Sequence, residues 1–134
     1  MNVPYPKLDD MRMKLSTLWI FVTLNYLYCD VLSHMEAETL KGILEGNVGG
    51  MDITPGFLLG ASVLMEIPMA MVLLSRLLPY RANRRANIIA GTIMTIVQFG
   101  SLFVGSSPAA YYLFFSVVEI SCTAGIVWYA WRSR

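Results

Sequence analysis

The sequence predicts an all-α protein, a four-helix transmembrane bundle whose helices run up-down-up-down. Of its 134 residues, 56% are hydrophobic and only 14% are charged. A soluble domain carries about 25% charged residues, and a chain this short cannot bury so much apolar surface in a water-soluble core. We therefore expect the surplus apolar surface to face lipid, in a single membrane domain that covers residues 1–134.

Four apolar stretches are long enough to cross a bilayer, since each contains about 20 mostly apolar residues. They cover approximately residues 15–33, 56–78, 86–104 and 109–131. Pro68 lies inside the second stretch, where a membrane helix tolerates it with a kink. The first stretch follows basic residues, as a signal peptide would, but it is too long and no small-residue cleavage site follows it. We expect it to be a retained helix.

The basic residues predict the orientation of these helices. Nine of the ten Lys and Arg residues lie in the N-terminal tail, around the connection between the second and third stretches, and at the C-terminus. The remaining one, Lys41, lies in the first connection. By the positive-inside rule, this asymmetry predicts a multi-pass protein of the cell inner membrane with both termini in the cytoplasm.

The first connection, residues 34–55, is the longest and is predicted to lie outside the cell membrane. Ser33 is expected to cap a short helix here with Glu36 as its capping-box partner, and Gly46 is expected to end it. The apolar residues of this helix share one face, which is typical of an amphipathic helix on a membrane surface. The alternative is a lid over an outward-facing opening. We favour the surface helix.

Two carboxyl groups lie deep inside the predicted helices. Glu66 and Glu119 are each about ten residues from the outer end of their helix, and therefore about 15 Å deep. A charged side chain costs at least about 2.5 kcal/mol at the centre of a membrane helix, so it usually has a function or a partner. If their helices are neighbours, the two groups can meet near the middle of the membrane.

Each predicted helix has one polar stripe at helical spacing, and the simplest arrangement points all four stripes at the bundle axis. The stripes comprise Ser16, Trp19, Thr23, Tyr26, Asp30 and Ser33; Ser62, Glu66 and Ala70; Asn87, Gly91, Thr95, Gln98 and Ser101; and Tyr112, Ser116, Glu119 and Thr123. From these we select five candidate ligand- or proton-binding residues, and no catalytic residue. They are Glu66, Glu119, Asp30, Gln98 and Tyr26.

Two close carboxyl groups in a low-dielectric interior cannot both be charged, so the pair holds a proton or binds a cation. That property suits a proton relay, the exchange of protons for a cationic substrate, or acid–base chemistry. A hydrogen-bonded pair that only holds helices together is the structural alternative. We predict proton- or cation-linked binding or transport of a small solute. A bundle of four helices leaves little room for a solute to pass through it, so we also expect a homo-oligomer in the lipid bilayer.

No cofactor or metal is predicted. Cys29 and Cys122 form no Cys-x-x-Cys motif, and the single histidine, His34, provides no metal-ligating cluster. Nucleic-acid binding is not predicted either, because no basic patch is interleaved with aromatic residues.

Several segments resemble an uncharacterised family of small bacterial four-helix membrane proteins. They are Tyr28-Cys-Asp-Val-Leu-Ser33, Met65-Glu-Ile-Pro68, Asn83-Arg-Arg-Ala-Asn-Ile88 and residues 114–120. More remotely, the architecture is similar to the DoxX-like four-helix group. That resemblance implies a non-catalytic accessory subunit of a membrane complex, with a redox complex as one example, and brings no site residues. A third alternative is an intramembrane acid–base enzyme acting on a lipid or quinone, which requires an opening that reaches Glu66.

Overall fold

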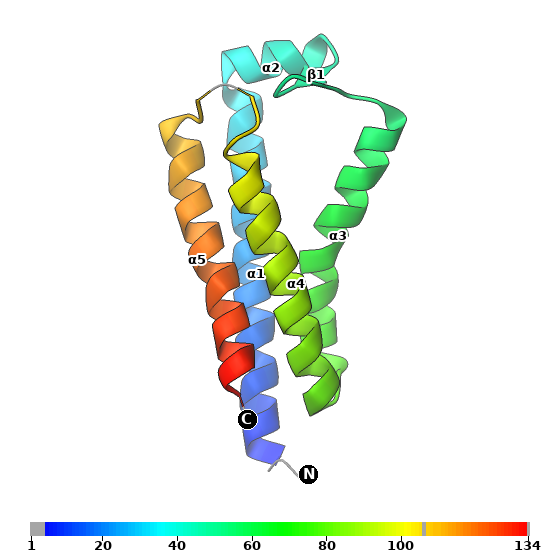
Figure 1. Cartoon of the computed structure of the whole chain (residues 1–134), viewed down its shortest axis with the longest axis vertical. Helices are drawn as coiled ribbons and strands as arrows, with labels where there is room; N and C mark the ends of the chain where they lie inside the picture. Colours follow the sequence, from blue (N-terminus) through cyan, green and yellow to red (C-terminus); the bar gives the residue numbers. More distant parts are fainter. Residues whose placement is uncertain (1–4, 106, 134) are drawn as a thin grey trace.

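The computed structural model of the chain describes residues 5–105 and 107–133. In this part the protein is all-helical, as the sequence predicts, with four long helices along its length and a short one across one end (Figure 1). The long helices are α1 (Tyr5–Met35), α3 (Pro55–Leu77), α4 (Tyr80–Ser101) and α5 (Ala110–Arg132). The short α2 (Ala37–Leu44) precedes a hairpin of β1 (Asn47–Val48) and β2 (Met51–Asp52).

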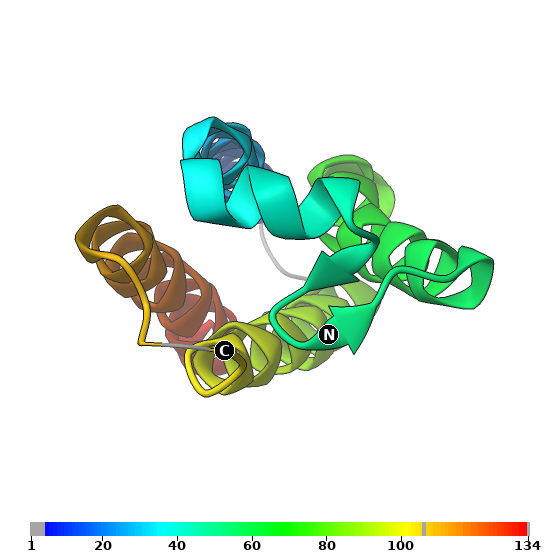
Figure 2. The same cartoon turned by 90° about the horizontal axis from the view of Figure 1, so that it is seen from above.

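The four long helices are arranged as a ring when viewed along their length (Figure 2). α1 packs against α3 and α5, and α4 packs against α5. α4 and α5 approach closely at Gly91, where an added Cβ would lie 2.7 Å from Cγ2 of Val127. The contact between α3 and α4 is smaller, because α3 leans away from the other helices toward the end that carries α2 (Figure 1).

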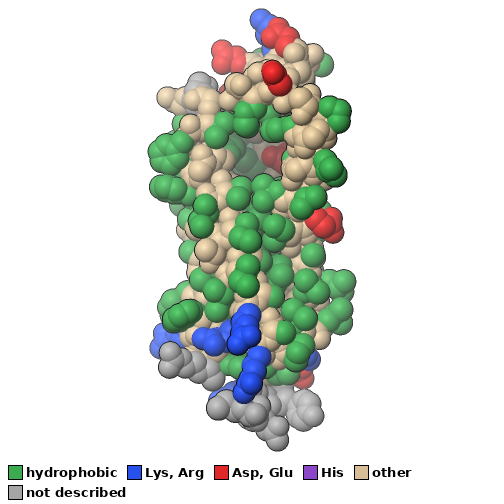
Figure 3. Space-filling view, turned by 45° about the vertical axis from the view of Figure 1, so that its right-hand side comes forward, with side chains coloured by type: hydrophobic (Ala, Val, Ile, Leu, Met, Phe, Trp, Pro, Cys, Tyr) green, Lys and Arg blue, Asp and Glu red, His purple; other side chains and the backbone are tan. Residues whose placement is uncertain are grey.

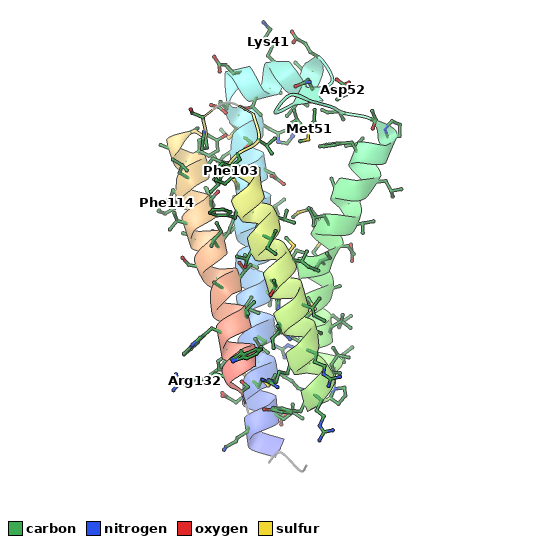
Figure 4. All side chains as sticks on the ribbon, viewed as in Figure 1. Lys41, Met51, Asp52, Phe103, Phe114 and Arg132 are labelled. Atoms are coloured by element: carbon green, nitrogen blue, oxygen red, sulfur yellow. The ribbon has the colours of Figure 1, made fainter. Side chains whose placement is uncertain are left out.

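The two ends of the molecule differ in charge. We call the end with α2 and the hairpin the loop end, and the end where α1 begins and α5 ends the basic end. Lys41 and Asp52 lie at the loop end, and Arg132 lies near the basic end (Figure 4). Most basic side chains gather at the basic end, and most of the visible acidic ones lie toward the loop end (Figure 3).

The hydrophobic core lies in the middle of the ring and toward the basic end. Its side chains of at most 4% exposure include Leu15, Trp19, Val22, Met94 and Ile126. α3 shows the asymmetry most clearly, because its buried residues, Pro68, Met71 and Ser75, all lie in the half near the basic end. Pro68 has no backbone N–H to donate within the helix, which allows α3 to change direction there. The loop-end half of α3 therefore covers little of the ring.

The sequence prediction places the start of two helices too late in the chain. α1 starts at Tyr5 rather than at residue 15, and α4 starts at Tyr80 rather than at residue 86. The first turns of α4 contain Arg81, Arg84 and Arg85, and the prediction followed the apolar stretch. Helical backbone hydrogen bonds form regardless of whether the side chains suit lipid, so the helix extends beyond that stretch.

The predicted capping box is wrong. Ser33 lies inside α1, where its hydroxyl donates to the carbonyl of Cys29 at 2.9 Å. Glu36 is itself the residue before α2 and makes no side-chain cap bond. The reason is that α1 continues to Met35, two residues beyond the predicted end. The predicted stop is confirmed, because Gly46 follows α2 with φ of 79° and donates its N–H to the carbonyl of Ile43.

The hairpin after α2 turns at two glycines. Gly49 and Gly50 have φ of 56° and 83°, which is the backbone that a two-residue hairpin turn requires. The turn lies against the connection between α4 and α5, since an added Cβ on Gly105 would lie 3.2 Å from Cα of Gly49. The hairpin thus spans the loop end instead of projecting from it.

Within the described residues, three helical segments are long and apolar enough to cross a membrane by length and composition, which suggests membrane association. They are Lys7–Met35, Pro55–Leu77 and Ala110–Arg132. α4 is not among them, and its first half contains three arginines together with the buried Asn83 and Asn87.

Candidate functional site

A cavity of about 580 Å³ lies at the loop end, below α2 and the hairpin. Three carboxylic residues, Asp30, Glu36 and Glu38, line it together with His34, and its described lining contains no Lys or Arg. Figure 3 shows a hollow below the loop end with red acidic atoms inside it. Because like charges gathered in a concave site concentrate counter-ions, this cavity favours a cation over an anion.

The start of α2 is held over the cavity by a hydrogen bond to α5. The hydroxyl of Tyr111, in the first turn of α5, lies 3.1 Å from Oε2 of Glu36 and 3.2 Å from Oγ of Ser33. Thr39 of α2 donates to the same Glu36 oxygen at 2.7 Å. Residues of α2 also form part of the cavity wall. The surface-helix and lid interpretations of this segment both stay predictions.

A line of polar side chains leads from the cavity wall toward the interior. Tyr112, which lines the cavity, donates its hydroxyl to Oγ of Ser101 at 2.7 Å. Ser101 donates to the carbonyl of Gln98 at 2.7 Å, and Nε2 of Gln98 donates to Oγ of Ser116 at 2.8 Å. Ser116 lies three residues, about one helical turn, before Glu119. The line therefore leads from the cavity wall to Ser116, about one turn of α5 from the buried carboxyl group.

Glu119 is the chemically unusual residue of this region. Its side chain is 1% exposed, and neither carboxyl oxygen has a hydrogen-bond partner within the described residues. The hydroxyl of the neighbouring Tyr26 is also buried and, within the same residues, has no partner. Asp30 and Tyr26 both lie within electrostatic range of Glu119. The structure thus brings together a lining carboxylate and two buried groups that can still form hydrogen bonds.

A carboxylate without a donor loses its hydration on burial and gains nothing in return, at a cost of several kcal/mol. Such a group is stable when a proton neutralises it, or when a cation or an N–H donor lies beside it. Glu119 can therefore hold a proton and exchange it for a cationic group. The tyrosine hydroxyl of Tyr26 can donate to the carboxylate when that proton leaves.

Glu66 does not take part in this site. Its side chain is exposed on the surface of α3, and it is not among the cavity-lining residues. The predicted meeting of Glu66 with Glu119 is therefore not formed within one chain. The reason is helical geometry: Pro68 faces the interior, and two residues correspond to about 200° of rotation around a helix. The stripe that begins at Ser62 accordingly faces outward.

At the other end, buried polar groups form a closed network. Nε1 of Trp19 donates to Oδ1 of Asn87 at 2.7 Å, and Oγ of Ser75 donates to the same oxygen at 3.3 Å. Nδ2 of Asn87 donates to Oδ1 of Asn83 at 2.6 Å, and Nδ2 of Asn83 donates to the carbonyl of Ser75 at 2.7 Å. All four side chains are 0% exposed. This network, which we call the asparagine network, joins α1, α3 and α4.

The structure places four of the five candidate residues in or next to the cavity. Asp30 lines the cavity, and Tyr26, Gln98 and Glu119 are buried below it. The sequence prediction missed the asparagine network, because Asn83 lay outside the helix predicted for residues 86–104. The available signal was the spacing of Asn83 and Asn87, which places both amides on one face of a helix.

The chain belongs to a family of unknown function, DUF6326, which matches residues 6–133. The resemblance to an uncharacterised family is thereby confirmed. No curated protein and no solved structure matches the chain.

Proposed function

We propose that the chain is a multi-pass membrane protein in which α1, α3, α4 and α5 cross the bilayer as a four-helix bundle. Large apolar side chains face outward on all four helices, among them Phe21, Leu59, Ile96 and Val117, each at least half exposed. Soluble monomers rarely expose such continuous apolar surface, and lipid accounts for it. α4 fits the bundle because Asn83 and Asn87 of its first half are buried against the other helices, and its arginines lie near the basic end.

The proposed orientation puts the basic end in the cytoplasm and the loop end outside the inner membrane. It rests on the positive-inside rule, because Lys41 is the one Lys or Arg residue, among those that the structure describes, that is not near the basic end. The cavity then opens toward the outside of the cell membrane.

Within this membrane, the cavity binds a small cationic solute, such as a protonated amine, in exchange for a proton held by Glu119. The observation that carries this proposal is a pair of buried groups next to an acidic cavity, Glu119 and Tyr26, which have no hydrogen-bond partner among the described residues. Asp30 attracts the cation into the cavity. The ammonium group then pairs with Glu119, which releases its proton. The asparagine network seals the opposite end, so a transport cycle would have to break these bonds.

The exchange is tested by measuring proton release. Methylammonium to hexylammonium chlorides are added to the detergent-solubilised protein in weakly buffered solution that contains a pH-indicator dye. We expect one length of the series to release about one proton per chain, because binding of a cation to a protonated carboxyl group displaces its proton. Glu119→Gln should abolish the release, since an amide has no proton to give up in this range.

Glu66→Gln is the matched control, since it makes the same substitution at a similar predicted depth but on the outer surface. It should leave the proton release unchanged. The proposal fails if no alkylammonium ion releases a proton from the folded protein, or if Glu119→Gln releases as much as the unmodified chain.

A second candidate function, an accessory subunit of a membrane complex, is favoured by the exposure of Glu66. This carboxyl group lies among the exposed apolar residues Val63, Met69 and Leu73 of α3. Ionisable side chains in membrane helices almost always face a protein interior or a partner. A neighbouring protein, or a second copy of the chain, would supply that partner.

A photo-crosslinking residue in place of Val63 separates these cases in native membranes. A crosslinked product of twice the chain mass supports a homo-oligomer, and a product with another protein supports an accessory subunit. If only lipid adducts form, Glu66 faces lipid and the second candidate is wrong.

A further inference from the structure

A groove of about 470 Å³ lies between α4 and α5, on the outer surface of the ring and toward the basic end. Its lining is mostly apolar and comes from both helices: Thr92, Thr95, Ile96, Ala124, Val127, Trp128 and Trp131. Ala124 provides a low floor between larger side chains. Along α5 the groove extends from Ala124 to Trp131, which is about 10 Å at 1.5 Å per residue. That length suits the first part of an acyl chain.

Two arginines lie at the basic end of this groove. Nε and Nη2 of Arg84 donate to the carbonyls of Ala130 and Trp131, both at 2.9 Å, and its Cζ lies 5.9 Å from the centre of the Trp131 ring. Cζ of Arg132 lies 5.2 Å from the centre of the Trp128 ring. Within the described part of the chain, neither guanidinium forms an ion pair with a carboxylate.

These contacts distinguish Arg84 from an arginine that serves only to orient the chain. An arginine that only sets the membrane orientation can extend freely into water, whereas Arg84 is hydrogen-bonded to the last carbonyls of α5. Each guanidinium carries five N–H groups, and the bonds of Arg84 to α5 use two of them. Its remaining donors, together with those of Arg132, lie beside the two tryptophan rings.

We propose that this groove binds an anionic phospholipid, with an acyl chain between Ile96 and Trp128 and the phosphate against Arg84 and Arg132. The apolar lining matches the chain, and the unpaired guanidinium groups match the negative headgroup. Tryptophan residues at this position suit the boundary between headgroup and hydrocarbon. The site rests on the membrane embedding proposed above, but it does not depend on the cavity or on Glu119.

The test uses the tryptophan fluorescence of the full chain in mixed micelles. Bromine atoms on an acyl chain quench tryptophan at short range, and Trp128 and Trp131 line the groove, whereas Trp19 is 0% exposed. Brominated phosphatidylglycerol should reach half-maximal quenching at a mole fraction about tenfold lower than brominated phosphatidylcholine, because two arginines act on the anionic headgroup. Arg84→Gln with Arg132→Gln should remove this difference.

Lys7→Gln with Arg76→Gln is the control pair, because it removes the same charge near the same end on α1 and α3. It should keep the preference for the anionic lipid. Ala124→Leu fills the groove without changing a charge and should weaken quenching by both lipids in a protein that keeps its helical circular dichroism. Equal quenching by the two lipids, or equal loss of preference in both arginine and control pairs, would overturn the proposal. Failure of the alkylammonium experiment would leave this result unaffected.

Discussion

The two ends of the ring treat buried polar groups in opposite ways. In the asparagine network near the basic end, Trp19, Asn83, Asn87 and Ser75 all find partners in one another or in the backbone. Toward the loop end, Glu119 is as deeply buried and has no partner within the described residues. Satisfied buried networks rigidify a protein, and unsatisfied groups mark functional or strained sites. The comparison indicates that one half stabilises the fold, and it supports the proposal that the other half is the binding site.

Packing follows the same division. α4 and α5 are in close contact at Gly91, whereas the loop-end half of α3 contributes no buried residue within the described chain. A binding site needs a region that can open and close, and such regions come from the less stable parts of a structure. The predictions below test whether equivalent substitutions have different effects in the two halves.

The largest effect is expected from Asn87→Leu. This change removes the acceptor of Trp19 and Ser75 and the donor to Asn83, which are all 0% exposed. Buried groups that lose their partners cost about 1–3 kcal/mol each, so we expect the free energy of unfolding to fall by about 3 kcal/mol. Unfolding in mixed SDS micelles measures this change.

Asn25→Leu is the control for this substitution. Asn25 donates an exposed hydrogen bond to the carbonyl of Phe21 in its own helix, and its side chain is half-buried. Its replacement should change stability by less than about 0.5 kcal/mol. Equal losses for the two variants would show that the asparagine network has no special role.

A smaller loss is expected from Gly91→Ala. The added Cβ would lie 2.7 Å from Cγ2 of Val127 and 3.3 Å from the carbonyl of Thr123, so α4 and α5 must separate. Such overpacking costs about 1–3 kcal/mol. Gly60→Ala, in the loop-end half of α3, meets nothing within 4 Å and should stabilise the helix by about 0.5 kcal/mol. Thermal unfolding in detergent measures both changes. If both variants shifted the melting temperature in the same direction, the proposed difference between the two halves would be contradicted.

The fold could be predicted well from the sequence because apolar stretches and membrane helices have similar lengths. The all-helical class is confirmed, and the four crossings and their orientation stay predictions. The helix ends were less predictable, since hydropathy marks where lipid would end and not where hydrogen bonding ends. Arg81, Arg84 and Arg85 lie inside α4 for this reason. The cap at Ser33 failed because a local motif cannot show that the preceding helix continues through it.

The site was only partly predictable, and the reason is the number of polar residues on each helix. α4 and α5 have several polar residues at helical spacing, which determine the inward face, and Gln98 and Glu119 are buried. In the loop-end half of α3, Ser62 and Glu66 are too few to determine a face. A single ionisable residue in an apolar helix points either to the interior or to a partner, and the sequence alone does not distinguish the two.

At Glu119 we expect a substitution to raise the free energy of unfolding instead of lowering it. Glu119→Met replaces an unpartnered carboxyl group with an apolar side chain, so we expect the free energy of unfolding to rise by about 1 kcal/mol. Gln98→Met removes the donor of the hydrogen bond to Ser116, which lies about one turn of α5 from Glu119. We expect this variant to lower the free energy of unfolding by a similar amount. The measurement is again unfolding in mixed micelles. A loss of stability in Glu119→Met would mean that this carboxyl group has a structural partner.

The smallest effect is expected where α2 is attached to α5. Tyr111→Phe removes the hydroxyl that contacts Glu36 and Ser33 and should cost about 0.5 kcal/mol, since such bonds are partly exposed. That loss corresponds to about twofold faster hydrogen exchange in α2, with no change in the asparagine network. Tyr28→Phe, on the exposed face of α1, is the control and should leave exchange in α2 unaltered. Faster exchange confined to α2 would show that this segment opens independently, as a lid would, whereas a global increase would mean that the two halves unfold together.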